Sequence, residues 1–307
     1  MKTRNLYKEI SDKIIEQLKK GIIPWHKPWT IRGDSSLIVS HSTGKGYSLL
    51  NALLLSEPGE YATFKQIEAE GGHVKKGAKS TPIFFWKQLF VQQKDVNGKP
   101  MTDKKGKPLM QKIPFLQYYN VFNILTDAEG IAPKFYRKYE PKKEKKEPKN
   151  RKAEKVASAY MKREKITLTN RKIDSAHYSP SCDNVQVPPI NDFDRPEEYY
   201  STLFHELTHS TGAEKRLDRP TMKNYFTSKA TRATEELIAE IGAATSLSML
   251  KIDNDKTLKN STAYVQSWLR ALEDDPKMVV VAAGKAEKAV DMIFDITHEP
   301  AKEVQNG

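Results

Sequence analysis

The chain has 307 residues, a net charge of +12 and 38% hydrophobic residues, a content sufficient for two domains with cores of their own. It contains no apolar run of about 18 residues and no apolar segment near Met1, so the sequence predicts neither a membrane span nor a secretory signal. The single cysteine, Cys182, excludes an internal disulfide and a cysteine-based zinc cage, and we expect a cytoplasmic protein.

The charge is unevenly distributed. Residues 1–130 hold 20 Lys and Arg against 12 Asp and Glu (+8), residues 131–172 hold 16 against 5 (+11), and residues 173–307 hold 15 against 22 (−7). We therefore expect a basic front half that binds a polyanion and an acidic back half that performs chemistry. The predicted fold class is α+β, with a small N-terminal α+β domain over 1–133, a charged linker over 134–165 and a C-terminal domain over 166–307.

The front half begins with an amphipathic helix, predicted over residues 5–20 and ended by Gly21. A rigid segment follows that contains Trp25, Lys27 and Trp29 beside two prolines. These side chains could form a stacking platform for single-stranded bases. Alternatively the two tryptophans fill a small core, which is the more common role for each of them taken alone.

The remaining front elements are a helix, two strands and a basic loop. We predict a helix over residues 49–55 and strands over 81–91 and 115–124, the strands joined by a mobile hairpin over 94–112. The loop before the first strand is rich in glycine, and its lysines suit phosphate contacts: Lys75, Lys76 and Lys79. The linker after the second strand is dominated by charge, and its first part is expected to be disordered.

The back half contains the sequence His-Glu-Leu-Thr-His at residues 205–209. On a helix, His205 and His209 lie one turn apart on the same face and can bind one metal ion, while Glu206 can accept a proton from the attacking water. A chance match is expected about once per hundred chains of this composition. Pro196 and the acidic residues that follow it indicate a true helix start, which favours the metal interpretation.

A second helix, predicted around residues 234–244, supplies the third ligand. Zinc hydrolases with two His and one Glu take the Glu from a second helix, and a further carboxylate often holds a ligand histidine. We assign Glu236 as the ligand and Glu240 as the residue that orients a histidine, with Glu235 as the rival ligand. Small residues at 242–244 would allow the two helices to pack closely.

The surroundings of this site are also predicted. A strand within residues 177–189 is placed to hold an extended peptide by β-addition. Tyr225 or Arg216, in the loop between the two helices, could stabilise an oxyanion. Two C-terminal helices over 262–272 and 278–296 are expected to pack the lower half of the domain.

The order of these motifs resembles that of ArdC-type antirestriction proteins of plasmids and other mobile elements. The matching segments cover nearly the whole chain: residues 21–29, 72–79, 119–123, 178–181, 199–209, 235–241 and Trp268. The resemblance implies an N-terminal single-stranded-DNA-binding domain joined to a zincin-like metallopeptidase domain, and protection of incoming DNA during conjugation. The hairpin over 94–112 departs from the family pattern as a local addition.

Three functions are weighed for this chain. The first is a DNA-tethered zinc endopeptidase, with Zn²⁺ held by His205, His209 and Glu236, although Mn²⁺ or Co²⁺ also suits such a site. Its substrate would be an unidentified protein, with a component of a restriction system as one possibility. The second is a non-catalytic protein that coats single-stranded DNA or blocks a restriction enzyme and carries a structural metal. The third is a metallonuclease. It is disfavoured because nucleases more often use clustered carboxylates and two metals.

Overall fold

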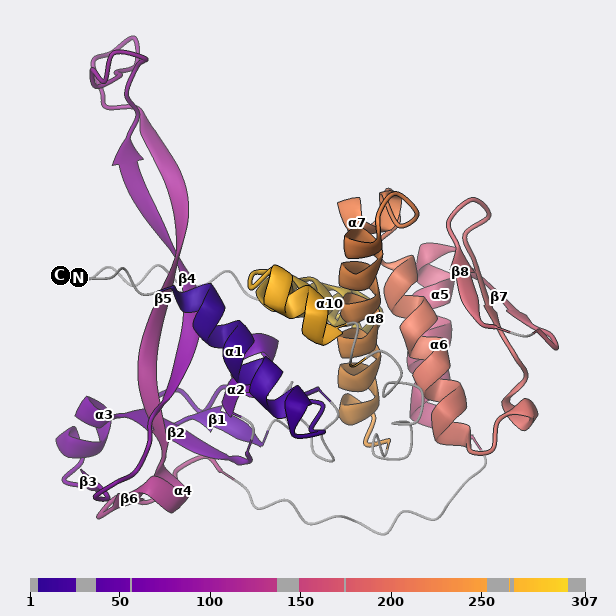
Figure 1. The fold of residues 1–307 in the computed structure, drawn as a ribbon, viewed down its shortest axis with the longest axis horizontal. Helices are drawn as coiled ribbons and strands as arrows, with labels where there is room; N and C mark the ends of the chain where they lie inside the picture. The colour runs from indigo at the N-terminus through magenta and orange to yellow at the C-terminus, as the bar shows by residue number, and fades with distance from the viewer. Residues whose placement is uncertain are drawn as a thin grey trace.

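The computed structural model describes residues 5–25, 37–55, 57–136, 149–173, 175–252, 265 and 268–297. Helices and strands are mixed, which confirms the α+β class. Figure 1 shows a front half organised around a sheet and a back half made mainly of helices, with α1 and α10 between them. Among the described helices, none has the length and apolar character needed to cross a membrane.

The front half is a four-stranded sheet with the order β1-β2-β5-β4, in which only the β1–β2 pair is parallel. Its elements in chain order are α1 (Leu6–Lys19), β1 (Ile38–Ser40), α2 (Leu49–Leu55), β2 (Gly59–Thr63), α3 (Phe64–Ala69), β3 (His73–Val74), β4 (Thr81–Gln92), β5 (Met110–Asn123), α4 (Ile124–Asp127) and β6 (Ala128–Glu129). The helices and strands predicted for this half are therefore confirmed, although β5 begins five residues earlier than expected.

The β4–β5 pair forms a long hairpin that projects away from the body of the protein (Figure 1). Its ladder runs from Thr81 opposite Val121 to Gln92 opposite Met110. Among the described strands, the outer part of β5 pairs with β4 alone. A proline is tolerated in a strand without a second neighbour, which explains Pro114 within the ladder.

The first hydrophobic core is shared by both halves of the chain. It joins apolar residues of α1 and α2 to residues of α8 (Lys229–Met249) and α10 (Met278–Phe294). Trp25 is fully buried in this core and meets Trp268 edge to face, with ring centroids 5.3 Å apart. The stacking role considered for Trp25 is therefore corrected, because its ring is covered by protein. Lys27 and Trp29 lie outside the described residues.

The second core belongs to the back half. Its other elements are α5 (Arg151–Glu164), β7 (Thr167–Asn170), β8 (His177–Ser179), β9 (Asn184–Val187), a 3₁₀ turn at Ile190–Asp192, α6 (Pro196–Ser210) and α7 (Pro220–Lys223). The strands form a sheet with the order β7-β9-β8. Helix α10 confirms the predicted helix over 278–296, whereas most of residues 262–267 lie outside the described part.

Helix α5 corrects the predicted linker, which is expected from the sequence to extend through residue 165. Ala153, Ala157 and Tyr160 form a narrow buried stripe on this helix, and the Tyr160 hydroxyl lies 3.1 Å from Ser210 Oγ on α6. The stripe consists of small residues and one tyrosine among many charges, so the charge conceals it in the sequence. Residues 137–148, where disorder is expected, are not described.

Candidate metal centre

Helix α6 carries the two histidines. It begins at Pro196 with acidic residues in its first turn, which suits both the missing N–H of proline and the helix dipole. Its buried face includes Leu203, Phe204 and Leu207, so packing against the second core fixes the helix. His205 and His209 consequently project one turn apart on another face, with Nε2 atoms 3.1 Å apart.

Helix α8 brings the third donor to the same point. Glu236 Oε2 lies 3.5 Å from His205 Nε2, and its Oε1 lies 3.8 Å from His209 Nε2. The helices approach closely because α8 has a glycine where they cross: a Cβ on Gly242 would stand 2.6 Å from the Thr208 side chain. The expected close packing at the small residues is therefore confirmed at Gly242.

These three side chains fit a single divalent ion. Their ligand atoms all lie within 4.8 Å of one another. Two donors bound to one tetrahedral zinc at about 2.0–2.1 Å are themselves roughly 3.3 Å apart, close to the separations observed here. Two imidazole nitrogens and a carboxylate oxygen are also the donor set of catalytic zinc sites. Among the residues that the structure describes, this is the one His, Cys, Asp and Glu group with such geometry.

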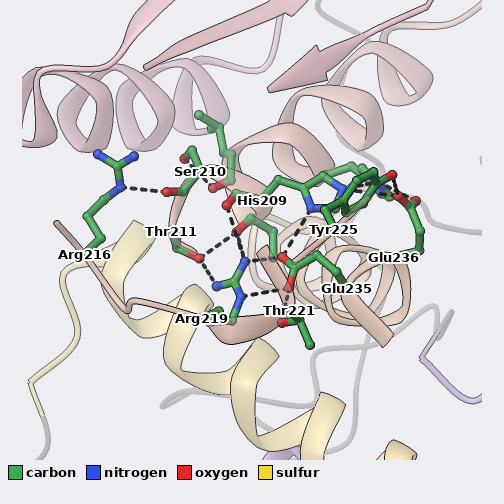
Figure 2. Close-up of polar contacts among 12 residues, drawn as sticks. His209, Ser210, Thr211, Arg216, Arg219, Thr221, Tyr225, Glu235 and Glu236 are labelled. Atoms are coloured by element: carbon green, nitrogen blue, oxygen red, sulfur yellow. Dashed lines mark hydrogen bonds and ion pairs between the residues drawn. The ribbon is translucent and has the colours of Figure 1, made fainter. Parts of the chain in front are cut away.

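Glu235, the rival ligand, has a different position. Its carboxylate is fully buried and receives hydrogen bonds from Arg219 and from Thr221 Oγ1, the latter at 2.6 Å (Figure 2). It also lies 3.3 Å from Nδ1 of His209, the ring nitrogen opposite the metal-facing one. Burial alone would raise the pKa of Glu235, but the contacts with His209 and Arg219 lower it to about 2. Glu235 thus orients His209, a role that the sequence analysis did not assign to it.

Arg219 completes this buried pair. Its guanidinium contacts both carboxylate oxygens of Glu235, at 2.6 and 3.2 Å, and donates to Thr211 Oγ1 and to the Thr208 carbonyl. Gly212 gives the side chain its space, because a Cβ there would lie 2.7 Å from the guanidinium. Sequence reasoning missed Arg219, since a lone arginine before a proline carries no signal of burial.

Glu240 lies beside the other ligand histidine, His205. Its Oε1 is 3.9 Å from His205 Nδ1, which is an ion-pair distance and too long for a hydrogen bond. Glu240 therefore lies where the sequence predicts it, beside the ring nitrogen of His205 that faces away from the metal position. Its contribution to metal binding stays a prediction.

The charges at this point favour a cation. Burial would lower the pKa of His205, but the hydrogen bond with Glu236 and the charges of Glu206 and Glu240 raise it to about 9. Burial would likewise raise the pKa of Glu236, and the two histidines instead lower it to about 2. Glu206 is nearly buried and lines the cleft beside the histidines. The carboxylates of Glu206, Glu236 and Glu240 thus place negative charge around His205.

The two residues considered for an oxyanion differ in position. The Tyr225 hydroxyl donates to Glu236, and its ring centroid lies 6.0 Å from that of His209. Arg216 is instead held by Asp183 and the Tyr178 hydroxyl, at 2.5 and 2.9 Å, and lies apart from the cluster in Figure 2. The assignment to Arg216 is therefore corrected, because its guanidinium is already satisfied, whereas Tyr225 faces the site.

A cleft of about 1380 Å³ lies over the cluster. This exceeds the roughly 300–1,000 Å³ of small-molecule pockets and leaves space for an extended peptide. One wall includes residues 175–183, with the edge strand β8, and the other includes Tyr225 and Phe226. Peptide binding by addition to β8 remains a prediction that this placement favours.

The predicted DNA-binding residues do not form one described group. Lys75, Lys76 and Lys79 are exposed on the loop after β3, and Lys75 Nζ donates to the Thr126 carbonyl at 2.9 Å. Trp25 is buried in the shared core. The loop lysines remain available for phosphate, but no described aromatic platform involving Trp25 accompanies them.

Comparison with known proteins agrees with this architecture. A family model described as a zincin-like metallopeptidase matches residues 155–285, and one described as the N-terminal domain of anti-restriction factor ArdC matches residues 4–122. The DNA primase TraC of Escherichia coli is 36% identical over 304 residues, which cover 96% of this chain. That match takes in 20% of the primase, so the chain spans about a fifth of the length of that protein.

Two solved structures are similar over nearly their whole length. The metal-free antirestriction ArdC protein from the R388 plasmid is 30% identical, with a TM-score of 0.69 and coverage of 94% of this chain and 97% of that one. Its Mn(II)-bound form is 29% identical, with a TM-score of 0.68 and coverage of 95% and 98%. The fold and the donor cluster thus define a zincin-like metallopeptidase domain behind an N-terminal domain. The chain belongs to the ArdC family of antirestriction proteins.

Proposed function

We propose that this protein is a zinc-dependent endopeptidase that binds single-stranded DNA and protects DNA entering the cell from restriction. The observation that carries the enzymatic part is the convergence of His205, His209 and Glu236 within 4.8 Å, beside Glu206 in an open cleft. A purely structural metal site would need no carboxylate between the two histidines. The Mn(II)-bound relative supports a divalent metal at this fold, and the donor set favours zinc.

Each residue has a definite part in the proposed hydrolysis. His205, His209 and Glu236 would hold the ion, which when bound supplies Lewis acidity and lowers the pKa of water. Glu206 accepts the proton of the attacking water and then passes it to the leaving amine. Tyr225 exchanges its hydrogen bond with Glu236 for one to the developing oxyanion of the peptide. The edge strand β8 aligns the substrate backbone.

The DNA-binding part is supported by the ArdC N-terminal match and by the positive charge of residues 1–172. Single-strand binding would hold the peptidase near incoming DNA, where its protein substrate would be a component of a restriction system. Such binding should weaken steeply with salt, because phosphate neutralisation contributes much of the affinity. The alternative is a protein that coats the strand or blocks a restriction enzyme without any cleavage.

The variant Glu206→Gln separates these possibilities, because it keeps the shape of the side chain and removes the base. We expect it to retain the metal, to lose at least about 100-fold in the rate of cleaving fluorescein-labelled denatured casein, and to lose protection of unmodified DNA in cells. A variant that still protects DNA as well as the wild type would show that protection needs no hydrolysis. Absence of casein cleavage by the zinc-loaded wild type, together with full protection by the variant, would overturn the enzymatic proposal.

A further inference from the structure

The projecting β4–β5 hairpin exposes an unusual amount of apolar surface. We define its outer part, residues 86–116, as the arm (Figure 1). Trp86 and Phe90 are 54% and 53% exposed, and Tyr119 at the base of the arm is 52% exposed. The arm's other exposed apolar side chains are Leu89, Val91, Val96, Met101, Met110 and Ile113. Large apolar side chains exposed in this number on one projecting element indicate a binding surface.

Both faces of the β4–β5 hairpin carry aromatic rings, at the base of the arm or on the arm itself. Residues paired directly across an antiparallel ladder lie on the same face. On one face, Phe85 stacks on Tyr119 with ring centroids 4.8 Å apart and planes at 16°, and Lys87 follows further out. On the other face, Phe90 pairs with Lys112, whose ammonium lies 5.3 Å from the ring centroid. Each face therefore presents a flat ring beside a positive charge.

The arm is also strongly basic. It holds seven lysines and two aspartates, a net charge of +5: Lys87, Lys94, Lys99, Lys104, Lys105, Lys107 and Lys112 against Asp95 and Asp103. Within the described part of the chain, none of these lysines forms a salt bridge. Their charges are thus available to a partner.

The tip of the arm is a duplicated turn that keeps the aspartates occupied. The sequence Asp-x-x-Gly-Lys-Pro occurs at residues 95–100 and again at 103–108. Asp95 Oδ1 accepts backbone N–H groups of Asn97 and Lys99 at 2.8 and 2.9 Å. Asp103 repeats both contacts at the same distances. The carboxylates therefore serve the backbone, and the lysines of both turns are exposed.

We propose that the arm is the surface that binds single-stranded DNA, with base stacking on Trp86 and Phe90 and phosphate contacts from the lysines of the tip. Exposed flat rings can stack only on unpaired bases, whereas a duplex keeps its base faces covered. A second copy of the arm is disfavoured as the partner, because two charges of +5 would be brought together. This inference rests on the proposed DNA-binding function and adds where the strand binds.

The test uses the full-length protein and a fluorescein-labelled thymidine 30-mer, with affinity followed by fluorescence anisotropy at 50–200 mM salt. The tip variant changes Lys99, Lys104, Lys105 and Lys107 to Gln. Its matched control changes four exposed helical lysines to Gln, which alters the net charge equally: Lys152, Lys155, Lys162 and Lys288. The ring variant is Phe90→Ala, and its control is Phe64→Ala, an exposed phenylalanine on α3 outside the arm.

We expect the tip variant to bind at least about 10-fold more weakly at 50 mM salt and to lose up to roughly 3 from the slope of log affinity against log salt, since each phosphate contact to a single strand contributes about 0.7. Phe90→Ala should lose at least about 5-fold. Both controls should stay within about 2-fold of the wild type. Far-ultraviolet circular dichroism and metal content should be unchanged in all four variants, because every substituted side chain is exposed.

The outcomes separate this inference from the proposed function. If the wild type fails to bind the oligonucleotide, the DNA-binding proposal itself is wrong. If the wild type binds and the tip and ring variants bind equally well, the arm is not the binding site, although the protein does bind single-stranded DNA. If a 30-base-pair duplex binds as tightly as the single strand and is weakened as much by Phe90→Ala, the single-strand assignment is overturned.

Discussion

The metal centre and the arm are built in opposite ways. At the centre, Arg219 and Glu235 are buried and meet each other at 2.6 Å, and Glu235 in turn holds His209. On the arm, lysines and aromatic rings are exposed on a two-stranded backbone ladder, and the aspartates of the turns accept hydrogen bonds from backbone N–H groups. The centre is thus organised in advance for one small ion, whereas the arm can adjust to a flexible polymer. Equal substitutions should therefore have very different effects on stability in the two regions.

The largest difference is expected for removal of a positive charge. Arg219→Met leaves the Glu235 carboxylate buried without its partner, which should lower the free energy of unfolding by about 3–5 kcal/mol. Lys99→Met on the arm removes an exposed charge and should change it by less than about 0.5 kcal/mol. Urea unfolding of both variants after chelator treatment measures this contrast without a contribution from bound metal. Similar losses in the two variants would contradict the view that the buried pair supports the centre.

Substitution of two helical glycines, Gly242 and Gly284, should change stability in opposite directions and by smaller amounts. Gly242→Ala places a Cβ 2.6 Å from Thr208 at the crossing of α6 and α8, so we expect a loss of about 1–3 kcal/mol and weaker metal binding. Gly284 lies on α10, where an added Cβ would meet nothing within 4 Å, so Gly284→Ala should raise stability by about 0.5–1 kcal/mol. Thermal unfolding and zinc titration follow both. Stabilisation by Gly242→Ala would show that the helices can separate without cost.

The smallest effect is expected for the pH dependence of folding stability when Asp183, at the edge of the cleft, is replaced by Asn. Burial would raise the pKa of Asp183, but Arg216, Lys215 and Tyr178 lower it to about 2, below its ordinary value of 3.8. A carboxyl with a lowered folded-state pKa contributes stability above its unfolded pKa and loses it as the pH falls through the folded one. The advantage of the wild type over Asp183→Asn should therefore be complete above about pH 5 and disappear between about pH 4 and 2. A difference in urea midpoint that is constant over this range would refute the ion-pair explanation.

Much of this architecture could be predicted from the sequence because its signals are local. The periodicity of α1, the apolar and aromatic run in β4 and the spacing of His205 and His209 each depend on a few neighbouring residues. The sequence favours Glu236 over Glu235 as the third ligand, but local signals alone do not decide between them. Adjacent residues on a helix point about 100° apart, and only the position of α6 and of Arg219 decides which carboxylate faces the histidines.

Other features depend on contacts between distant parts of the chain. Trp25 resembles a stacking residue among basic neighbours, and its partner Trp268 lies far away in the sequence. Helix α5 is hidden because its buried stripe is short and its exposed surface is densely charged. The sequence predicts the arm as a hairpin, but its exposure follows from the absence of a second neighbour for the outer half of β5 among the described strands.

The most direct test of the account is the metal content of the purified protein by mass spectrometry, as isolated and after incubation with zinc. The wild type should hold about one ion per chain, and Glu236→Ala should lose it. Glu214→Ala is the control, since this glutamate also lines the cleft but is 83% exposed and should leave the metal in place. An unchanged metal content in Glu236→Ala, or no metal in the zinc-treated wild type, would contradict the proposed centre.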